Sequence, residues 1–155
     1  MTQIGLIDDH TMFRRGLKSL IEVNPNYSVI IEAANGKEFI KKLETHPLPE
    51  IVLLDIKMAE MDGYETAKWI QDNHPQILVL ALSTMDSDLS IIQMILNGAR
   101  GYILKGADPD ELKLAFEEVK SIGYYFNNEV SRKVISNIRH IVNDKDGIGV
   151  ALRLN

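Results

Sequence analysis

The sequence contains no cysteine, which excludes disulfides, thiolate metal ligands and thiol nucleophiles together. A chain without thiols fits a reducing cytoplasm, and that is the location we expect. Long hydrophobic runs are also missing, so no segment is expected to contact or cross a membrane. The first residues lack the charged segment and apolar stretch of a signal peptide.

An excess of basic residues is absent as well. The chain has 17 Lys and Arg against 22 Asp and Glu, a formal net charge of −5. This balance argues against a general surface for nucleic acids or anionic membranes. The length of 155 residues is enough for one domain with a full hydrophobic core.

Short apolar runs alternate along the chain with segments of helical period. Several of the runs are continuous, which is typical of parallel strands covered on both faces. We therefore predict an α/β domain, a three-layer sandwich with helices on both faces of the sheet. Its five-stranded parallel sheet is expected to have the flavodoxin-like order 2-1-3-4-5. The expected strands are residues 4–8, 28–33, 50–55, 77–82 and 99–104.

Three helix starts carry clear capping signals. Asn35, Asp62 and Asp108 are each followed three residues later by glutamate, the pattern of an N-cap and its third helical position. Proline follows Asp108 directly, as is common at the first helical position. Residues 128–142 predict one more amphipathic helix, beyond the five βα units, and a loose tail is expected to follow it.

Polar side chains stand at the ends of four of the expected strands. Asp8 and Asp9 end the first, Asp55 ends the third, and the fourth and fifth run into Ser83 and Lys105. Ligands of open α/β sheets bind beyond the carboxyl ends of the strands. We therefore expect these five side chains to gather at one edge of the sheet.

This set of side chains suits phosphoryl transfer. Three crowded carboxylates repel each other, and a hard divalent cation such as Mg²⁺ would compensate them. Lys105 and the Ser83 hydroxyl would add donors that stabilise a transferring phosphoryl group, with Asp55 as its acceptor. Each residue alone has a plainer explanation as a helix cap, a solvated strand end, a loop residue or a surface lysine. Only their coincidence at neighbouring strand ends favours the site.

Four motifs occur in the order and at the spacing of the receiver domains of two-component response regulators. They are LIDDHTMFRRGL, LLDIKMAEMDG, LALST and GARGYILKGADPDEL. The sequence resembles that family over residues 2–122, and most of all the NarL/FixJ-like subfamily that carries a C-terminal helix-turn-helix domain. The resemblance implies a receiver domain at 1–123, with a linker helix and tail at 124–155 and no output domain. DNA would be contacted only through the missing output domain.

The resemblance also implies roles for the acidic residues. Asp55 corresponds to the phosphoacceptor, and the phosphodonor would be a phosphohistidine on a sensor histidine kinase. Asp8 and Asp9, with Asp55, correspond to the Mg²⁺ ligands, and the backbone carbonyl of Lys57 to a further ligand. Ala59 departs from the proline that many relatives have there, so we expect a slightly looser loop.

Three more positions match residues that respond to the phosphoryl group. Ser83 corresponds to the hydroxyl residue that hydrogen-bonds it, Lys105 to the lysine that pairs with it, and Tyr102 to the aromatic switch position. We predict that Ser83 moves toward the phosphoryl oxygens and makes room for the Tyr102 ring to turn inward. The plainer alternative is that Tyr102 is an ordinary aromatic residue of a strand.

The expected helix at residues 88–96 carries two apolar stripes. One helix cannot bury both against its own sheet, so one stripe is predicted to be a partner surface. We assign this role to Ile91, Met94 and Ile95, and expect a homodimer through the region of residues 88–96 and 108–121. The alternative is cover from a neighbouring helix or from the tail.

Two other functions stay open beside the receiver. A phosphohydrolase with an aspartate nucleophile would share the sheet, but such enzymes have a second aspartate where this chain has Lys57. A degenerate receiver would act only as a binding module, and the complete acidic set argues against that. We therefore expect no enzyme beyond a domain that catalyses its own phosphorylation and dephosphorylation.

Overall fold

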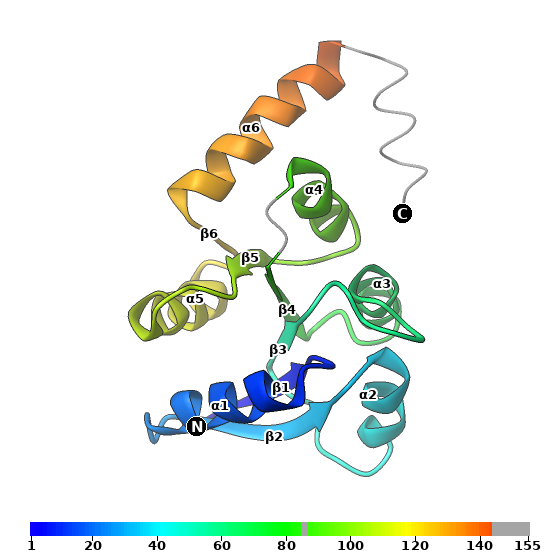
Figure 1. Cartoon of the computed structure of the whole chain (residues 1–155), viewed down its shortest axis with the longest axis vertical. Coiled ribbons are helices and arrows are strands. Elements are labelled where there is room, and N and C mark those ends of the chain that lie inside the picture. The colour runs from blue at the N-terminus through cyan, green and yellow to red at the C-terminus, as the bar shows by residue number, and fades with distance from the viewer. Residues whose placement is uncertain (85–86, 144–155) are drawn as a thin grey trace.

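A parallel sheet of six strands runs through the centre of the molecule (Figure 1). The structure is a computed structural model and describes residues 1–84 and 87–143, with side chains up to residue 139. The tail expected after the last helix lies outside the described residues. The strands are β1 (Thr2–Ile7), β2 (Tyr27–Ala33), β3 (Ile51–Leu54), β4 (Leu78–Ser83), β5 (Gly101–Leu104) and β6 (Tyr125–Phe126).

The flavodoxin-like α/β fold is confirmed, but the predicted sheet was one strand short. The observed order is β2-β1-β3-β4-β5-β6, so the order of the first five strands was correct. β6 has only two residues and pairs with β5 at Gly101 and Tyr102. A Cβ atom at position 101 would lie 2.5 Å from the Tyr125 carbonyl oxygen, so a glycine is needed for this approach. A pair of strand residues is too short to show any periodicity.

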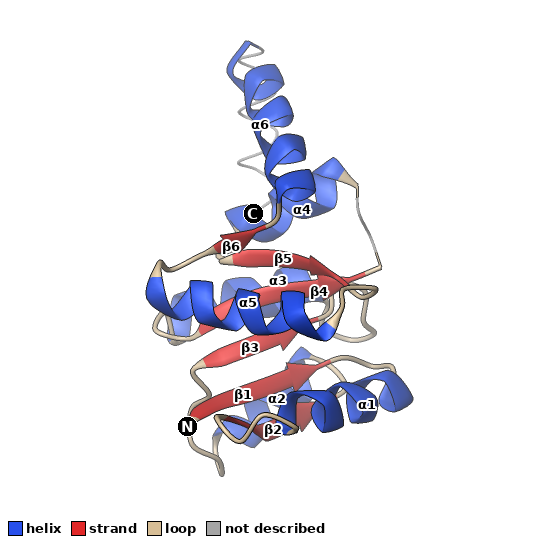
Figure 2. Ribbon diagram, turned by 90° about the vertical axis from the view of Figure 1, so that its left-hand side faces the viewer, coloured by secondary structure: helices blue, strands red, loops and turns tan. Residues whose placement is uncertain are grey.

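Five helices cover the two faces of the sheet (Figure 2). α1 (Thr11–Glu22) and α5 (Pro109–Ser121) lie on one face, and α2 (Gly36–Leu43), α3 (Gly63–Asn73) and α4 (Asp88–Leu96) lie on the other. Each face has its own hydrophobic cluster, with Phe116 buried under α5 and Phe39 buried under α2. The sheet is therefore buried on both sides, as its continuous apolar strands predict.

The three predicted N-caps are confirmed. The side chains of Asn35, Asp62 and Asp108 accept hydrogen bonds from backbone N–H groups of residues 38, 65 and 111 at 2.9, 3.0 and 2.9 Å. Each such cap contributes about 1 kcal/mol to helix stability. The cap at Asp62 also fixes where α3 begins, directly after the loop that follows Asp55.

The last helix, α6 (Asn128–Asn143), lies against α4 rather than on the sheet (Figure 1). Val130 is buried, and Val134 packs against the same hydrophobic cluster. The Asn137 side chain donates a hydrogen bond of 2.7 Å to the Asp88 carboxylate at the start of α4. The predicted amphipathic helix is therefore present, and its apolar side covers α4.

The predicted partner surface is wrong, because two of its three residues are buried in the core. Ile91 and Met94 are 1% and 0% exposed and belong to the core, and Ile95 packs against the same cluster. The large apolar side chains that α4 exposes are instead Leu89 and Leu96, at 58% and 38%. The helical period was read correctly. The sequence did not show which of the two stripes faces the sheet, nor that α6 would lie beside it.

No helix in the described part of the chain is long and apolar enough to cross a membrane.

Candidate functional site

Two neighbouring strands bring the predicted acids together. β1 and β3 pair in register with Ile7 opposite Leu54, so the next residues, Asp8 and Asp55, leave the sheet at the same level. The Asp55 N–H donates a hydrogen bond of 2.9 Å to the Ile7 carbonyl. One carboxylate oxygen from each of Asp8, Asp9 and Asp55 lies within 4.8 Å of the others. The predicted acidic cluster is therefore present at this edge of the sheet.

The loop after β1 is held by contacts other than a helix cap. Asp8 Oδ1 accepts a hydrogen bond of 2.8 Å from the His10 N–H, and His10, the N-cap residue of α1, makes no side-chain cap hydrogen bond. Arg14 Nη1 donates to the Asp8 carbonyl at 2.5 Å, and Arg14 Nε lies 3.4 Å from Glu32 Oε1. The sequence did not predict a role for Arg14. Its position in the first turn of a helix that follows two acids was the available signal.

The other two strands bring Ser83 and Lys105 to the same edge. β4 and β5 pair with each other so that Ser83 lies opposite Leu104. The Lys105 N–H donates a hydrogen bond of 3.0 Å to the Ser83 carbonyl. Lys105 Nζ lies 2.8 Å from Asp8 Oδ2 and 3.5 Å from Asp55 Oδ2. Its side chain is only 13% exposed. The largely buried Lys105 ammonium therefore lies between the two buried carboxylates of the site, those of Asp8 and Asp55.

One oxygen of this cluster fits a metal ligand. Asp8 Oδ2 is buried, and its charged neighbour is the Lys105 ammonium, whose Nζ lies 2.8 Å away. Three carboxylates offer only oxygen donors, which are the ligands that Mg²⁺ prefers. The residues present therefore fit a hard divalent cation.

The electrostatics of the site reflect the same crowding. Burial and the neighbouring Asp8 charge raise the pKa of Asp55 above its ordinary value, and Lys105 only partly opposes them. Burial lowers the pKa of Lys105, but the carboxylates of Asp8 and Asp55 outweigh burial and hold that pKa above its usual value. Asp55 is thus a carboxylate whose charge the fold disfavours and Lys105 a cation whose charge it favours.

We expect Asp55→Asn to stabilise the fold near neutral pH. Because the folded-state pKa of Asp55 is raised, its contribution to stability is full below the unfolded pKa of about 3.9 and is lost as pH rises through the folded value. Asparagine avoids that loss, so the Tm should rise by roughly 2–6 °C at neutral pH. Thermal melts in a metal chelator should show this gain shrinking toward pH 4. A gain that is independent of pH would contradict the assignment.

Tyr102 and Lys57, two of the predicted site residues, differ in exposure: the first is buried and the second has an exposed side chain. Tyr102 is 0% exposed and lies in the core cluster with Ile91 and Met94. The ring is buried in this structure, and its inward turn as part of a switch stays a prediction. Lys57 has an exposed side chain in the loop after β3, and its backbone carbonyl as a metal ligand stays a prediction.

A hollow of 490 Å³ opens beside the acidic cluster, with Ser83 and Lys105 in its wall. Its other wall is formed by Glu111 at the start of α5 and by Asn127 and Glu129 at the start of α6. Glu111 accepts a hydrogen bond of 3.1 Å from the Asn127 side chain, which ties the two helix starts together. This wall could not be predicted from the sequence, because it depends on β6, whose two residues carry no periodicity.

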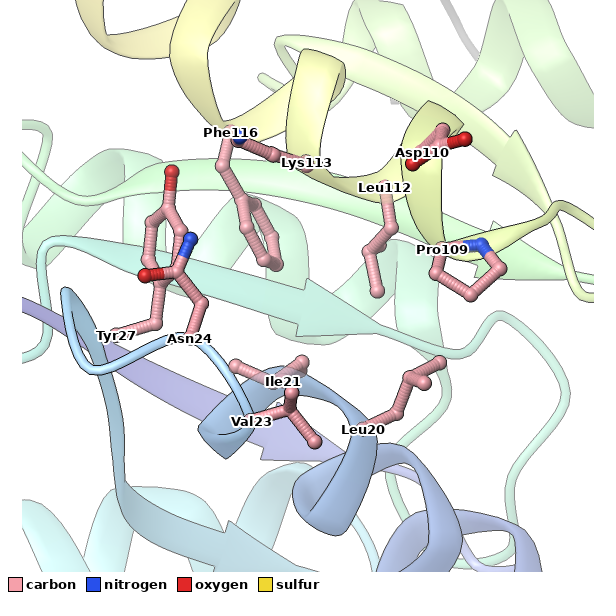
Figure 3. A pocket seen from close by; sticks show the side chains of 10 residues that line it. All are labelled: Leu20, Ile21, Val23, Asn24, Tyr27, Pro109, Asp110, Leu112, Lys113 and Phe116. Atoms are coloured by element: carbon pink, nitrogen blue, oxygen red, sulfur yellow. The ribbon is translucent and has the colours of Figure 1, made fainter.

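A further hollow, of 190 Å³, lies between the end of α1 and the start of α5 (Figure 3). Its lining is largely apolar and includes Ile21, Leu112 and Phe116. None of the predicted site residues lines it. The predicted site residues therefore lie outside this hollow, at the carboxyl end of the sheet.

Comparison with known proteins matches residues 4–117 to the response regulator receiver domain. The chain is 31% identical over 144 residues to the transcriptional regulatory protein DegU of Brevibacillus brevis, covering 93% of this chain and 61% of that protein. It is 39% identical over 112 residues to the transcriptional regulatory protein YdfI of Bacillus subtilis, covering 72% of this chain and 52% of that protein. The chain thus spans little more than half the length of the curated relatives it matches.

Solved structures agree with this match. A two-component response regulator of the LuxR family from Aurantimonas superposes with a TM-score of 0.79 at 27% identity, covering 88% of this chain and 98% of that one. The receiver domain of the response regulator NarL from Mycobacterium tuberculosis gives a TM-score of 0.71 at 27% identity, covering 77% and 97% of the two chains.

Proposed function

Because the chain belongs to the response regulator receiver domain family, we propose that it accepts a phosphoryl group on Asp55 in two-component signal transduction. The observation that carries this proposal is the arrangement around Asp55, a buried carboxylate beside two further acids and the Lys105 ammonium. Aspartate is an established phosphoryl acceptor, and the transfer depends mostly on positioning and on charge stabilisation.

The transfer exchanges one bond to phosphorus for another. An Asp55 oxygen attacks the phosphorus of a phosphohistidine on a sensor histidine kinase and forms the new O–P bond. The N–P bond of the phosphohistidine breaks, and its electron pair leaves with the imidazole. Lys105 Nζ, which lies 3.5 Å from Asp55 Oδ2, would pair with the phosphoryl oxygens, and the Ser83 hydroxyl would donate to them.

We propose Asp8, Asp9 and Asp55 as Mg²⁺ ligands, with the backbone carbonyl of Lys57 as a further one. When bound, Mg²⁺ neutralises charge on the transferring phosphoryl group. The close grouping of the three carboxylates supports this assignment, because one oxygen from each lies within 4.8 Å of the others. Apart from its own phosphorylation and dephosphorylation, we propose no enzymatic activity for the chain.

The phosphorylated state would act on partners through a conformational change. An aspartyl phosphate adds a charge of roughly −1.5 to −2 and three acceptor oxygens next to Ser83 and Lys105. We propose that this biases a two-state equilibrium in which Ser83 and Tyr102 take part, and that the change controls a transcriptional output or a partner. We propose residues 1–123 as the receiver domain and residues 124–155 as a linker helix and tail. We also propose a cytoplasmic location and a homodimer through α4 and α5.

The proposal predicts a single Mg²⁺-dependent adduct. Incubation with Mg²⁺ and acetyl phosphate, followed by intact mass measurement, should add the mass of one phosphoryl group to the wild-type chain. Asp55→Asn should show none, and a chelator should remove most of the wild-type adduct. Continuous release of phosphate at high turnover would favour a phosphohydrolase instead. A wild-type chain with neither adduct nor turnover would leave only a binding module.

A further inference from the structure

The ammonium group of Lys105 has a third neighbour besides its two carboxylates. Lys105 Nζ lies 4.7 Å from the centroid of the Phe13 ring and over its face. An ammonium at that distance is attracted by the negative face of an aromatic ring. The Lys105 side chain is only 13% exposed, so water screens this attraction less than it would on an open surface.

Phe13 reaches Lys105 because of where α1 begins. The helix starts at Thr11, only two residues after Asp9, so its first turn stands over the carboxyl end of the sheet. Phe13 and Lys105 line the same hollow of 250 Å³, whose other lining residues are largely apolar, Leu17 and Leu112 among them. The ring therefore forms the apolar border of the site on the side of α1, while the acids form the other border.

We propose that Phe13 is a positioning residue for phosphoryl transfer, which holds the Lys105 ammonium at the edge of the site through a cation–π contact. This inference rests on the function proposed above. Lys105 has to serve two purposes, because it neutralises Asp8 and Asp55 in the resting site and has to pair with the phosphoryl group in the transfer. A neutral ring attracts the ammonium without competing for the metal or for the phosphoryl group, as another carboxylate would.

The test uses phosphorylation by acetyl phosphate with Mg²⁺, with the initial rate followed by intact mass. Phe13→Leu keeps an apolar side chain and removes the ring, and we expect the rate to fall roughly 3- to 10-fold. Phe13→Trp offers the strongest aromatic face and should remain within about twofold of wild type. Leu20→Met is the matched control, because Leu20 lines the same hollow about two helical turns along α1 from Phe13, and this exchange should leave the rate unchanged.

A series of fluorinated phenylalanines at position 13 separates this role from simple packing. One, two and three fluorines withdraw charge from the ring face in steps while its shape changes little. We expect the phosphorylation rate to fall in the same steps while the Tm stays nearly constant, a pattern that a packing role would not produce. Equal rates across the series, or a Phe13→Leu variant as fast as wild type, would overturn the inference.

The wild-type chain in the same assay distinguishes the two failures. If wild type is not phosphorylated, the proposed function fails and the Phe13 inference fails with it. If wild type is phosphorylated and the series is flat, only the role of Phe13 is wrong.

Discussion

Gly63→Ala is expected to destabilise the protein by about 2–3 kcal/mol and to slow phosphorylation of Asp55 well beyond what the loss of stability explains. A Cβ atom at position 63 would lie 2.4 Å from the Asp55 carbonyl oxygen and 2.5 Å from Ile56 Cα. Both neighbours are backbone atoms, so no side-chain rotation can relieve the contact. The Gly63 N–H also donates a hydrogen bond of 2.7 Å to the Ile56 carbonyl, which holds the start of α3 against the loop that follows Asp55.

A matched glycine gives the control. Gly16 lies inside α1, and no atom of the described residues lies within 4 Å of its Cβ position, so Gly16→Ala should stabilise by up to about 1 kcal/mol through helix propensity. Thermal melts should therefore move in opposite directions, with Gly63→Ala lower by roughly 4–12 °C and Gly16→Ala slightly higher. A Gly63→Ala variant as stable and as readily phosphorylated as wild type would contradict the described packing of the loop.

Lys105→Ala should change two properties in opposite directions. Without Lys105, the transferring phosphoryl group loses its nearest protein cation, and we expect phosphorylation to slow by about 100-fold. The three acids of the cluster also lose the cation that competes with Mg²⁺ for them. We therefore expect the variant to bind Mg²⁺ roughly several-fold more tightly than wild type. Calorimetric titration with Mg²⁺ and intact-mass kinetics measure the two effects separately.

Lys120→Ala is the matched control for charge. Lys120 contacts Thr2 and Glu50 at the opposite end of the sheet from Asp8, with Nζ 2.7 Å from Thr2 Oγ1. Its removal deletes the same charge far from the site and should leave both properties within about twofold of wild type. Weaker Mg²⁺ binding in Lys105→Ala, or an unchanged rate, would show that Lys105 does not have the role assigned to it.

Features that depend on residues close in sequence could be predicted well. The caps at Asn35, Asp62 and Asp108 act over three residues, so their patterns were sufficient. The meeting of Asp8 with Asp55 spans a longer separation, yet it followed from a general rule about strand ends in parallel sheets. In such cases the geometry is set by regular secondary structure alone.

Features that depend on side-chain packing between distant segments could not be predicted. Whether Ile91 or Leu89 faces the core depends on where α4 lies against the sheet and on cover from α6. The burial of Tyr102 and the pairing of β6 with Gly101 depend on the same segment after residue 122. Phe13 beside Lys105 joins the first helix to the fifth strand, and no periodic pattern links those two positions.

The central claim is that Asp55 is the residue that carries the phosphoryl group. Borohydride reduces an acyl phosphate to an alcohol, so it would convert a phosphorylated aspartate into homoserine and mark its place in the chain. After treatment with acetyl phosphate and Mg²⁺, peptide mapping by tandem mass spectrometry should find homoserine at position 55, and at no other aspartate. Homoserine at Asp8 or Asp9 instead, or labelling that persists in Asp55→Asn, would contradict the account.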